Sequence, residues 1–165
     1  MMEPEVLGQL FDEHAPALVL YARQWCGTPE DVVQEAFIKL AAQGPPPAKP
    51  VPWLYRVVRN AALNAAGAAR RRRRHEAAAA EARPWFVVPD RATLDVETAT
   101  AALLALPLEL REVIIAHLWG GLTFEQVGEL MGTSASTAYR GYVAGLSALR
   151  DRLGVVCPNR SKTRP

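Results

Sequence analysis

The most distinctive chemistry in this sequence lies in five consecutive arginines, Arg70–Arg74. Adjacent guanidinium groups repel one another and bind phosphate oxygens, so the run favours a polyanionic partner. It closes a basic block, residues 43–75, that holds eight Lys or Arg and no Asp or Glu. Residues 1–42, by contrast, hold seven acidic and two basic residues, and the whole chain has a net charge of only +2. This asymmetry predicts a nucleic-acid surface.

Three other interpretations of the arginine run stay open at this point. It could be a solvated charge run, a patch that binds RNA or a membrane surface without sequence preference, or a surface that binds another protein. Its position favours DNA, because the run extends a helix that the spacing of apolar residues predicts from about Pro52.

The polar side of that predicted helix carries an aromatic residue together with Arg and Asn. This combination suits single-stranded or distorted DNA, because unstacked bases stack on rings. Trp53 taken alone also fits a half-buried core position, and Arg59 falls at the edge of the polar side. The candidate DNA contacts are Trp53, Arg56, Arg59, Asn60, Asn64, Arg70, Arg71, Arg72, Arg73 and Arg74.

A second nucleic-acid signal lies in residues 123–153, whose pattern is typical of a helix-turn-helix. Thr123 caps a short helix, Gly132 begins a tight turn, and Ser134 caps a longer helix. The outer face of the longer helix would enter the major groove, where Ser and Thr bond phosphates or bases and Arg bonds guanine. That face carries Ser136, Thr137, Arg140, Val143, Ala144 and Ser147. A plain helical hairpin is the alternative.

Little in the sequence supports catalysis or metal binding. His14, His75 and His117 are isolated from one another, and the first and last fall on apolar helix faces. Cys26 and Cys157 are far apart and lack a CxxC pattern, which argues against zinc and against a disulfide framework. We therefore expect no catalytic residue, no metal and no cofactor. The acidic N-terminus and the lack of a long apolar run predict a soluble, cytoplasmic protein.

The periodicity predicts an all-α fold of two small helical domains joined by a flexible linker. The N-terminal domain, residues 4–74, is expected to hold helices over 4–26, 29–42 and from 52 onward. Thr28 is expected to cap the second helix with its side chain, and Pro29 to begin it.

Residues 75–95 are predicted to form the linker, and residues 154–165 a flexible tail. The C-terminal domain would then span residues 96–153. Within it, a helix over 108–118 is expected to bury Leu110, Val113, Ile114, His117 and Leu118.

Three stretches, in this order, carry a family resemblance: DVVQEAFIKL at 31–40, WLYRVVRNAALNAAGAARRRRR at 53–74, and ALPLELREVIIAHLWGGLTFEQVGELMGTSASTAYRGYVAGLSALRDRL at 105–153. Together they resemble the extracytoplasmic-function (ECF) subgroup of the sigma-70 family. The first is similar to the polymerase-docking helix, the second to the helix that recognises and melts the minus-ten promoter element, and the third to the domain that reads the minus-thirty-five element. The resemblance implies a sigma factor, which binds core RNA polymerase and directs transcription initiation at promoters.

The resemblance also assigns roles to residues. Asp31, Gln34, Glu35 and Phe37 would dock on the polymerase, although Phe37 fits core packing better. The candidates between Trp53 and Arg74 would contact the minus-ten element, and the Pro-rich loop at 43–52 would hold a flipped base. The minus-thirty-five contacts would be Thr123, Ser134, Ser136, Thr137, Tyr139, Arg140, Val143, Ala144 and Ser147. The implied partners are the β′ and β subunits of core RNA polymerase, promoter DNA and an anti-sigma factor.

Two departures from the family pattern affect the second DNA-reading helix. The family usually has Val-Lys-Ser-Arg where this chain has Ala138, Tyr139, Arg140 and Gly141, and Gly141 and Gly145 lower the helix propensity. We therefore expect intact polymerase docking and an atypical minus-thirty-five readout. A stand-alone helix-turn-helix regulator, or an inactive sigma-like protein, is the alternative function.

Overall fold

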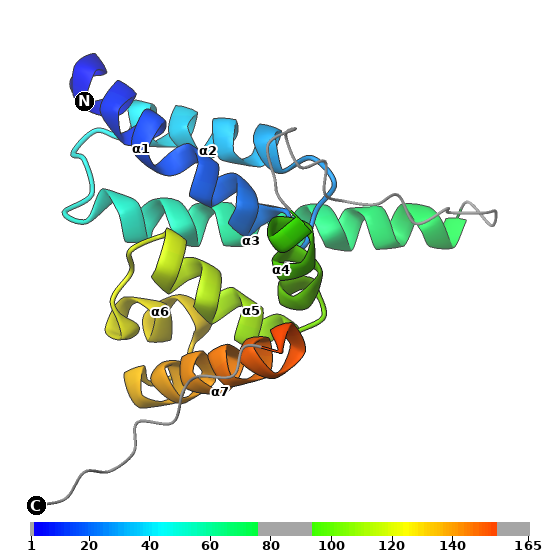
Figure 1. Ribbon diagram of the computed structural model, residues 1–165. Helices are drawn as coiled ribbons and strands as arrows, with labels where there is room; N and C mark the ends of the chain where they lie inside the picture. The colour runs from blue at the N-terminus through cyan, green and yellow to red at the C-terminus, as the bar shows by residue number, and fades with distance from the viewer. Residues whose placement is uncertain (1, 76–93, 155–165) are drawn as a thin grey trace, which may run out of the picture.

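The computed structural model describes residues 2–75 and 94–154 of the chain (Figure 1). Its elements are α1 (Pro4–Ala22), α2 (Pro29–Ala42), α3 (Pro50–His75), α4 (Leu94–Leu104), α5 (Leu108–Ile114), the π-helical turn η1 (Ile115–Trp119), α6 (Phe124–Met131) and α7 (Ala135–Leu153). These ranges contain helices and no strand, so the predicted all-α fold is confirmed. Nearly all of the predicted linker lies outside the described residues.

The N-terminal unit consists of α1, α2 and α3, which pack on one another. Each of the three begins at a proline, because a proline at the first helical position gives up only an N–H that would have no partner there. The fully buried side chains at the centre of this unit are Leu18, Tyr21, Val33, Leu40, Leu54, Tyr55 and Val58.

Three expected features of the N-terminal unit are wrong in detail. The first helix ends at Ala22 instead of residue 26, because Gln24 and Trp25 donate to carbonyls only three residues back and so form turns. Thr28 occupies the cap position of α2, but its side chain makes no capping hydrogen bond. The third helix begins at Pro50, two residues before the expected start.

The C-terminal unit consists of α4 to α7, and its centre departs from the sequence pattern at η1. The N–H of Gly120 bonds to the carbonyl of Ile115, five residues back, which widens the helix and rotates the faces of the residues within it. Ile115 and Ala116 are therefore buried, whereas Leu118 is 53% exposed. The expectation that Leu118 is buried was wrong for this reason.

The two units pack against each other and share one hydrophobic core. Helix α1 contacts η1, and α3 contacts α6. Gly120 allows this close approach, since a Cβ there would lie 2.5 Å from the hydroxyl of Tyr55 in α3. In Figure 1, α3 runs between α1 and α2 on one side and the C-terminal unit on the other, and its far end projects beyond the body. No helix in the described ranges has both the length and the apolar character needed to cross a membrane.

Candidate nucleic-acid interface

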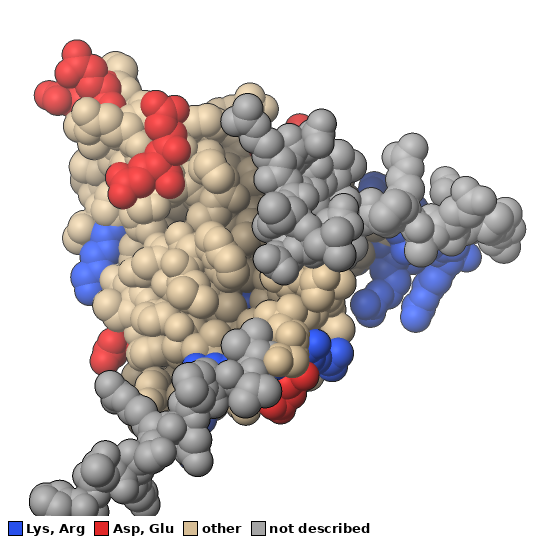
Figure 2. Space-filling model, viewed as in Figure 1, with Lys and Arg blue, Asp and Glu red and all other residues tan. Residues whose placement is uncertain are grey.

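Helix α3 presents most of its predicted DNA contacts to solvent. Arg56, Asn60 and Asn64 are exposed along the helix, and Arg70–Arg74 are exposed on the end that projects from the body. Figure 2 shows Lys and Arg side chains gathered at this projecting end. Among the described residues the five arginines are exposed, so their guanidinium groups are accessible to phosphates. Trp53 is half-buried and packs against the core, as the alternative for that residue predicted.

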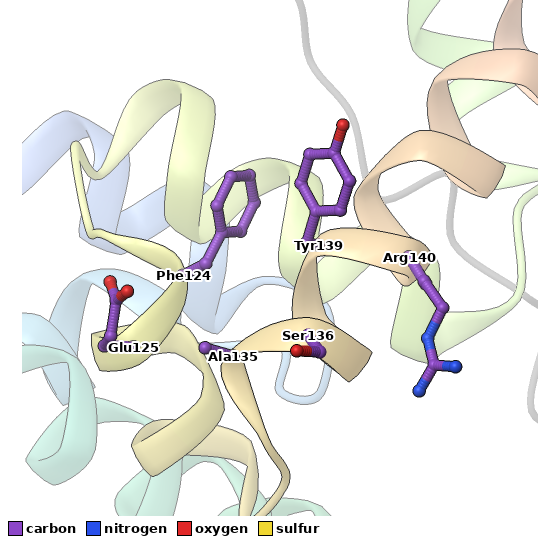
Figure 3. A pocket seen from close by; sticks show the side chains of 6 residues that line it. All are labelled: Phe124, Glu125, Ala135, Ser136, Tyr139 and Arg140. Carbon is purple, nitrogen blue, oxygen red and sulfur yellow. The ribbon is translucent and has the colours of Figure 1, made fainter.

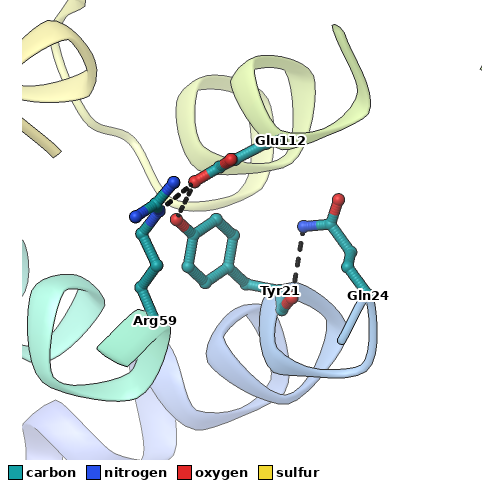
Figure 4. Close-up of polar contacts among 4 residues, drawn as sticks. All are labelled: Tyr21, Gln24, Arg59 and Glu112. Carbon is teal, nitrogen blue, oxygen red and sulfur yellow. Dashed lines mark hydrogen bonds and ion pairs between the residues drawn. The ribbon is translucent and has the colours of Figure 1, made fainter. Parts of the chain in front are cut away.

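Arg59 differs from the other candidates because another unit of the same chain already holds it. Its Nε donates to Oε1 of Glu112 in α5 over 2.7 Å, and its guanidinium carbon lies 6.0 Å from the centre of the Trp25 ring. Tyr21 of α1 donates its hydroxyl to the same carboxylate oxygen over 2.6 Å (Figure 4). One carboxylate of the C-terminal unit therefore bridges two helices of the N-terminal unit.

The ionisation of this trio fits its geometry. Burial raises the pKa of Tyr21 above its ordinary range, and the neighbouring charge of Glu112 raises it further, so the phenol stays neutral and donates its proton. Burial alone would lower the pKa of Arg59, but the hydrogen bond and charge of Glu112 outweigh burial and raise it. The guanidinium therefore remains charged, and the ion pair is complete.

The helix-turn-helix is held by the caps that its sequence predicts. Thr123 accepts from the N–H of Gln126, whose side chain in turn accepts from the N–H of Thr123, which completes a capping box at α6. Ser134 accepts from the N–H of Thr137 and caps α7. Gly132 ends α6 in the left-handed region, at φ 70°, where glycine pays no steric cost.

Gly128 allows the turn between the two helices to be this tight. A Cβ at Gly128 would lie 2.8 Å from the carbonyl oxygen of Thr133 and 3.0 Å from the backbone N of Ala135. The neighbouring atoms belong to the backbone, so they cannot move aside as a side chain would. The angle between α6 and α7 therefore depends on the absence of a side chain at this position.

The predicted reading face of α7 is exposed along its length. Solvent reaches all of its members, namely Ser136, Thr137, Tyr139, Arg140, Val143, Ala144 and Ser147, and the capping residues Thr123 and Ser134 are exposed beside them. Arg140 donates to the hydroxyl of Thr137 over 3.3 Å, which orients its guanidinium along the helix. The structure thus brings the whole predicted set together on one surface.

An open hollow of about 420 Å³ lies between the first turns of α6 and α7. Its lining residues are Phe124, Glu125, Ala135, Ser136, Tyr139 and Arg140, and Figure 3 shows Phe124 and Tyr139 side by side with Arg140 pointing away from them. The rings of Phe124 and Tyr139 meet edge to face, with centroids 5.3 Å apart. Glu125 accepts from its own N–H and from the Thr123 hydroxyl, which lowers the pKa of its carboxyl.

An aromatic cluster supports the reading helix from beneath. His117 stacks on Phe124 with ring centroids 4.1 Å apart and meets Tyr142 of α7 edge to face. Its Nδ1 lies 2.7 Å from the carbonyl oxygen of Leu122. His117 therefore serves packing, as its apolar helix face indicated.

Within the described residues, no group of three or more His, Cys, Asp or Glu is placed to hold a metal ion.

Helix α2 carries the predicted polymerase-docking residues, and the structure divides them. Asp31, Gln34 and Glu35 are exposed, whereas Phe37 is buried in the core. The neighbouring Ile38 is 62% exposed, one turn along from Gln34. The burial of Phe37 agrees with the core-packing alternative, which fits this residue better than the docking role implied by the resemblance. The exposed apolar side chain on this surface is that of Ile38.

Sequence reasoning missed two residues that link the units, Tyr55 and Glu112. Both are buried and both meet the other unit, Tyr55 at Gly120 and Glu112 through its bonds to Tyr21 and Arg59. No local signal marks Glu112, because its short helix also carries the charged residues Glu109 and Arg111, among which another carboxylate is ordinary.

The comparisons with known proteins agree with this arrangement. Residues 10–75 match the model of sigma-70 region 2, and residues 97–149 match the model of sigma-70 region 4. The two matches together span more than half of the chain, which therefore belongs to the sigma-70 family. Members of this family bind core RNA polymerase and direct transcription initiation at promoters. The resemblance predicted from the sequence is confirmed.

Two solved structures share the fold. The sigma factor RpoE from Bartonella quintana, in complex with the anti-sigma factor NepR, superimposes with a TM-score of 0.66 at 22% identity, covering 91% of this chain and 98% of that chain. CnrH in complex with the cytosolic domain of CnrY gives a TM-score of 0.61 at 22% identity, covering 92% and 90%. No curated protein matches the chain significantly.

Proposed function

We propose that this sigma factor assigns a separate task to each of three exposed surfaces. The outer face of α2 binds core polymerase, α3 binds the minus-ten element as it melts, and α7 reads the minus-thirty-five element. The observation that carries the proposal is that a charged α3 and a capped helix-turn-helix lie on one chain with an exposed docking helix, in the order of regions 2 and 4.

The α3 surface suits melted DNA for a physical reason. Exposed Asn60 and Asn64 can bond to base edges that a duplex hides, and the arginines beyond them hold the phosphates of either strand. The α7 surface suits intact duplex, because a capped and braced helix can enter the major groove as a rigid body. The two surfaces together fit a promoter that is open at one element and closed at the other.

The α2 surface suits a protein partner. It combines an exposed branched apolar side chain, Ile38, with the acidic and amide groups of Asp31, Gln34 and Glu35. An apolar centre with a polar rim is the usual composition of a protein interface. Following the resemblance, we assign it to the coiled coil of the β′ subunit, and we place the action of the protein in the cytoplasm.

Run-off transcription with purified core polymerase tests the function directly. Templates from a genomic library should yield promoter-specific transcripts only when the protein is present. Absence of any specific product, together with a free homodimer in size-exclusion chromatography with core enzyme, would instead support a stand-alone regulator.

A docking variant separates the first task from the other two. Ile38→Asp should abolish co-migration with core polymerase, whereas Val6→Asp, which changes an exposed apolar residue of α1, should leave it intact. Binding of Ile38→Asp to DNA should stay unchanged. Equal behaviour of the two variants with polymerase would contradict the assignment of α2.

Two of the similar solved structures are complexes, one with the anti-sigma factor NepR and one with the cytosolic domain of CnrY. By analogy we propose that this chain also has an anti-sigma partner. Co-purification of a protein that suppresses the run-off signal when added back would support this proposal.

A further inference from the structure

Glu112 is a charged side chain buried where the two units meet. Only 3% of the residue is exposed, and it belongs to α5 of the C-terminal unit. Its hydrogen-bond donors, Tyr21 and Arg59, belong to the N-terminal unit, on α1 and α3 (Figure 4). The contact between the units therefore depends on a polar group as well as on apolar burial.

This ion pair depends on the arrangement of the units. A buried carboxylate is costly unless it is paired, and the partners of Glu112 are available only while the units are packed together. When the units separate, water solvates the carboxylate, the phenol and the guanidinium. Removing the charge of Glu112 therefore weakens the packed state, whereas the separated state loses little.

We propose that, while the two units are packed together, Glu112 competes with promoter DNA for Arg59 in the middle of α3. This rests on the proposed function, in which Arg59 contacts the minus-ten element. Glu112 holds the Nε of Arg59 at 2.7 Å and neutralises its charge, and only 26% of the Arg59 side chain is exposed, so a phosphate or base gains less from this guanidinium while the ion pair is intact. DNA binding at Arg59 and packing of the units therefore oppose each other, and each must weaken the other by the same factor.

The competition is local. The exposed arginines Arg70–Arg74 and the outer face of α7 are accessible while the units are packed. The packed chain can therefore still attract DNA through its charge, and Asn60 and Asn64 stay exposed, but Arg59 becomes available only after Glu112 releases it. The device would suppress engagement of melted DNA by the free chain without hiding the whole protein.

Glu112→Gln is the principal test, and Glu109→Gln, at an exposed glutamate of the same helix, is its control. Binding to a 30-nucleotide single strand of mixed sequence is measured by fluorescence anisotropy at about 0.2 M salt, where the arginine run contributes less. Small-angle X-ray scattering gives the radius of gyration. Glu112→Gln should bind roughly ten-fold more tightly and be more extended, because a hydrogen bond to a charge is lost from the packed state.

A second pair of variants shows whether the gain passes through Arg59. In an Arg59→Ala background, Glu112→Gln should give no increase in affinity. Tyr21→Phe keeps the buried ring and removes only the hydroxyl donor, so it should raise affinity by about three-fold even if Glu112→Gln folds poorly by circular dichroism. Unchanged affinity and radius in both Tyr21→Phe and a folded Glu112→Gln would overturn the proposal.

A ten-fold gain that persists without Arg59 would also overturn it, because the carboxylate would then act by general charge. Run-off transcription by the wild-type chain tests the proposed function independently. A chain that initiates at promoters but shows no effect of Glu112 would retain that function and lose this regulation.

Discussion

The two proposed DNA-binding surfaces, on α3 and on α7, differ in charge and in positional restraint. Helix α3 carries its charge on a long projecting end, Arg70–Arg74, that is exposed and lies beyond the body of the protein. Helix α7 carries one arginine on its reading face, Arg140, but is fixed by a side-chain cap, a left-handed glycine and an aromatic cluster. The first surface has charge with little positional restraint, and the second has positional restraint with little charge.

This difference indicates how affinity and specificity are divided between the surfaces. Phosphate contacts supply salt-dependent affinity without sequence information, whereas base contacts from a fixed helix supply discrimination. We therefore expect the arginine run to contribute most of the binding free energy and α7 to contribute most of the discrimination between DNA sequences. The predictions below test this division, beginning with the largest expected effect.

Replacing Arg70–Arg74 with alanine should weaken binding to any DNA by about 100-fold or more at ~50 mM salt. Each lost phosphate contact removes a counterion-release term, so the slope of log affinity against log salt should fall by up to about 4. Anisotropy titrations over a range of salt concentrations measure both quantities. Co-migration with core polymerase through α2 serves as the control and should persist. An unchanged salt slope would show that the run is only a solvated surface.

Gly128→Ala should damage the α7 surface and spare the α3 surface. The added Cβ would meet backbone atoms at 2.8 and 3.0 Å, so the turn must open, at a cost of about 1–3 kcal/mol in unfolding free energy. Chemical denaturation measures this cost, and binding to duplex should fall more than binding to single strands. Gly8→Ala is the control, because a Cβ there meets nothing within 4 Å. Equal loss on both kinds of DNA would contradict the separation of tasks.

Much of the α7 surface could be predicted from sequence, because its determinants are local. The caps Thr123 and Ser134 and the turn glycine Gly132 act within a few residues of their own positions, and the outer face follows from helical spacing. The same reasoning extended α1 four residues too far and predicted that Leu118 is buried. A short turn ends α1 early, and the π-helical turn η1 changes the helical register at Leu118; no local sequence signal marks either turn.

The contact between the units could not be predicted from sequence, because it depends on tertiary packing. Nothing in their own helices marks Tyr55 and Glu112 as buried. Their burial accompanies the packing of η1 on α1 and of α6 on α3. The sequence predicted a DNA contact for Arg59 from its helix alone, and that pattern carries no information about the Glu112 carboxylate that binds it. Loosely joined domains were expected, and the structure shows a shared core.

Arg140→Ala should reduce sequence discrimination more than affinity. A single guanidinium that bonds a guanine contributes about 1–3 kcal/mol of preference at one base pair. Its loss should lower the slope of log affinity against log salt by only about 1. Selection of bound duplexes from a randomised library, followed by sequencing, should show one relaxed position. Arg150→Ala, on the last turn of α7, is the control and should leave the preferences intact. Loss of affinity for all sequences alike would make Arg140 a phosphate contact.

The smallest effect separates the two glycines that make α7 atypical. A Cβ at Gly145 would lie 2.7 Å from Cδ1 of Ile114, so this glycine allows α5 to pack closely, and Gly145→Ala should destabilise the fold. A Cβ at Gly141 would lie 3.7 Å from both Leu110 and Val113, an ordinary contact. Gly141→Ala should therefore stabilise the chain by about 0.5–1 kcal/mol through helix propensity. Thermal denaturation distinguishes the signs. If Gly141→Ala stabilises the helix and also sharpens the base preference, the flexibility of α7 limits its sequence discrimination. If stability rises and the base preference does not change, the small number of polar groups on the outer face of α7 limits that discrimination.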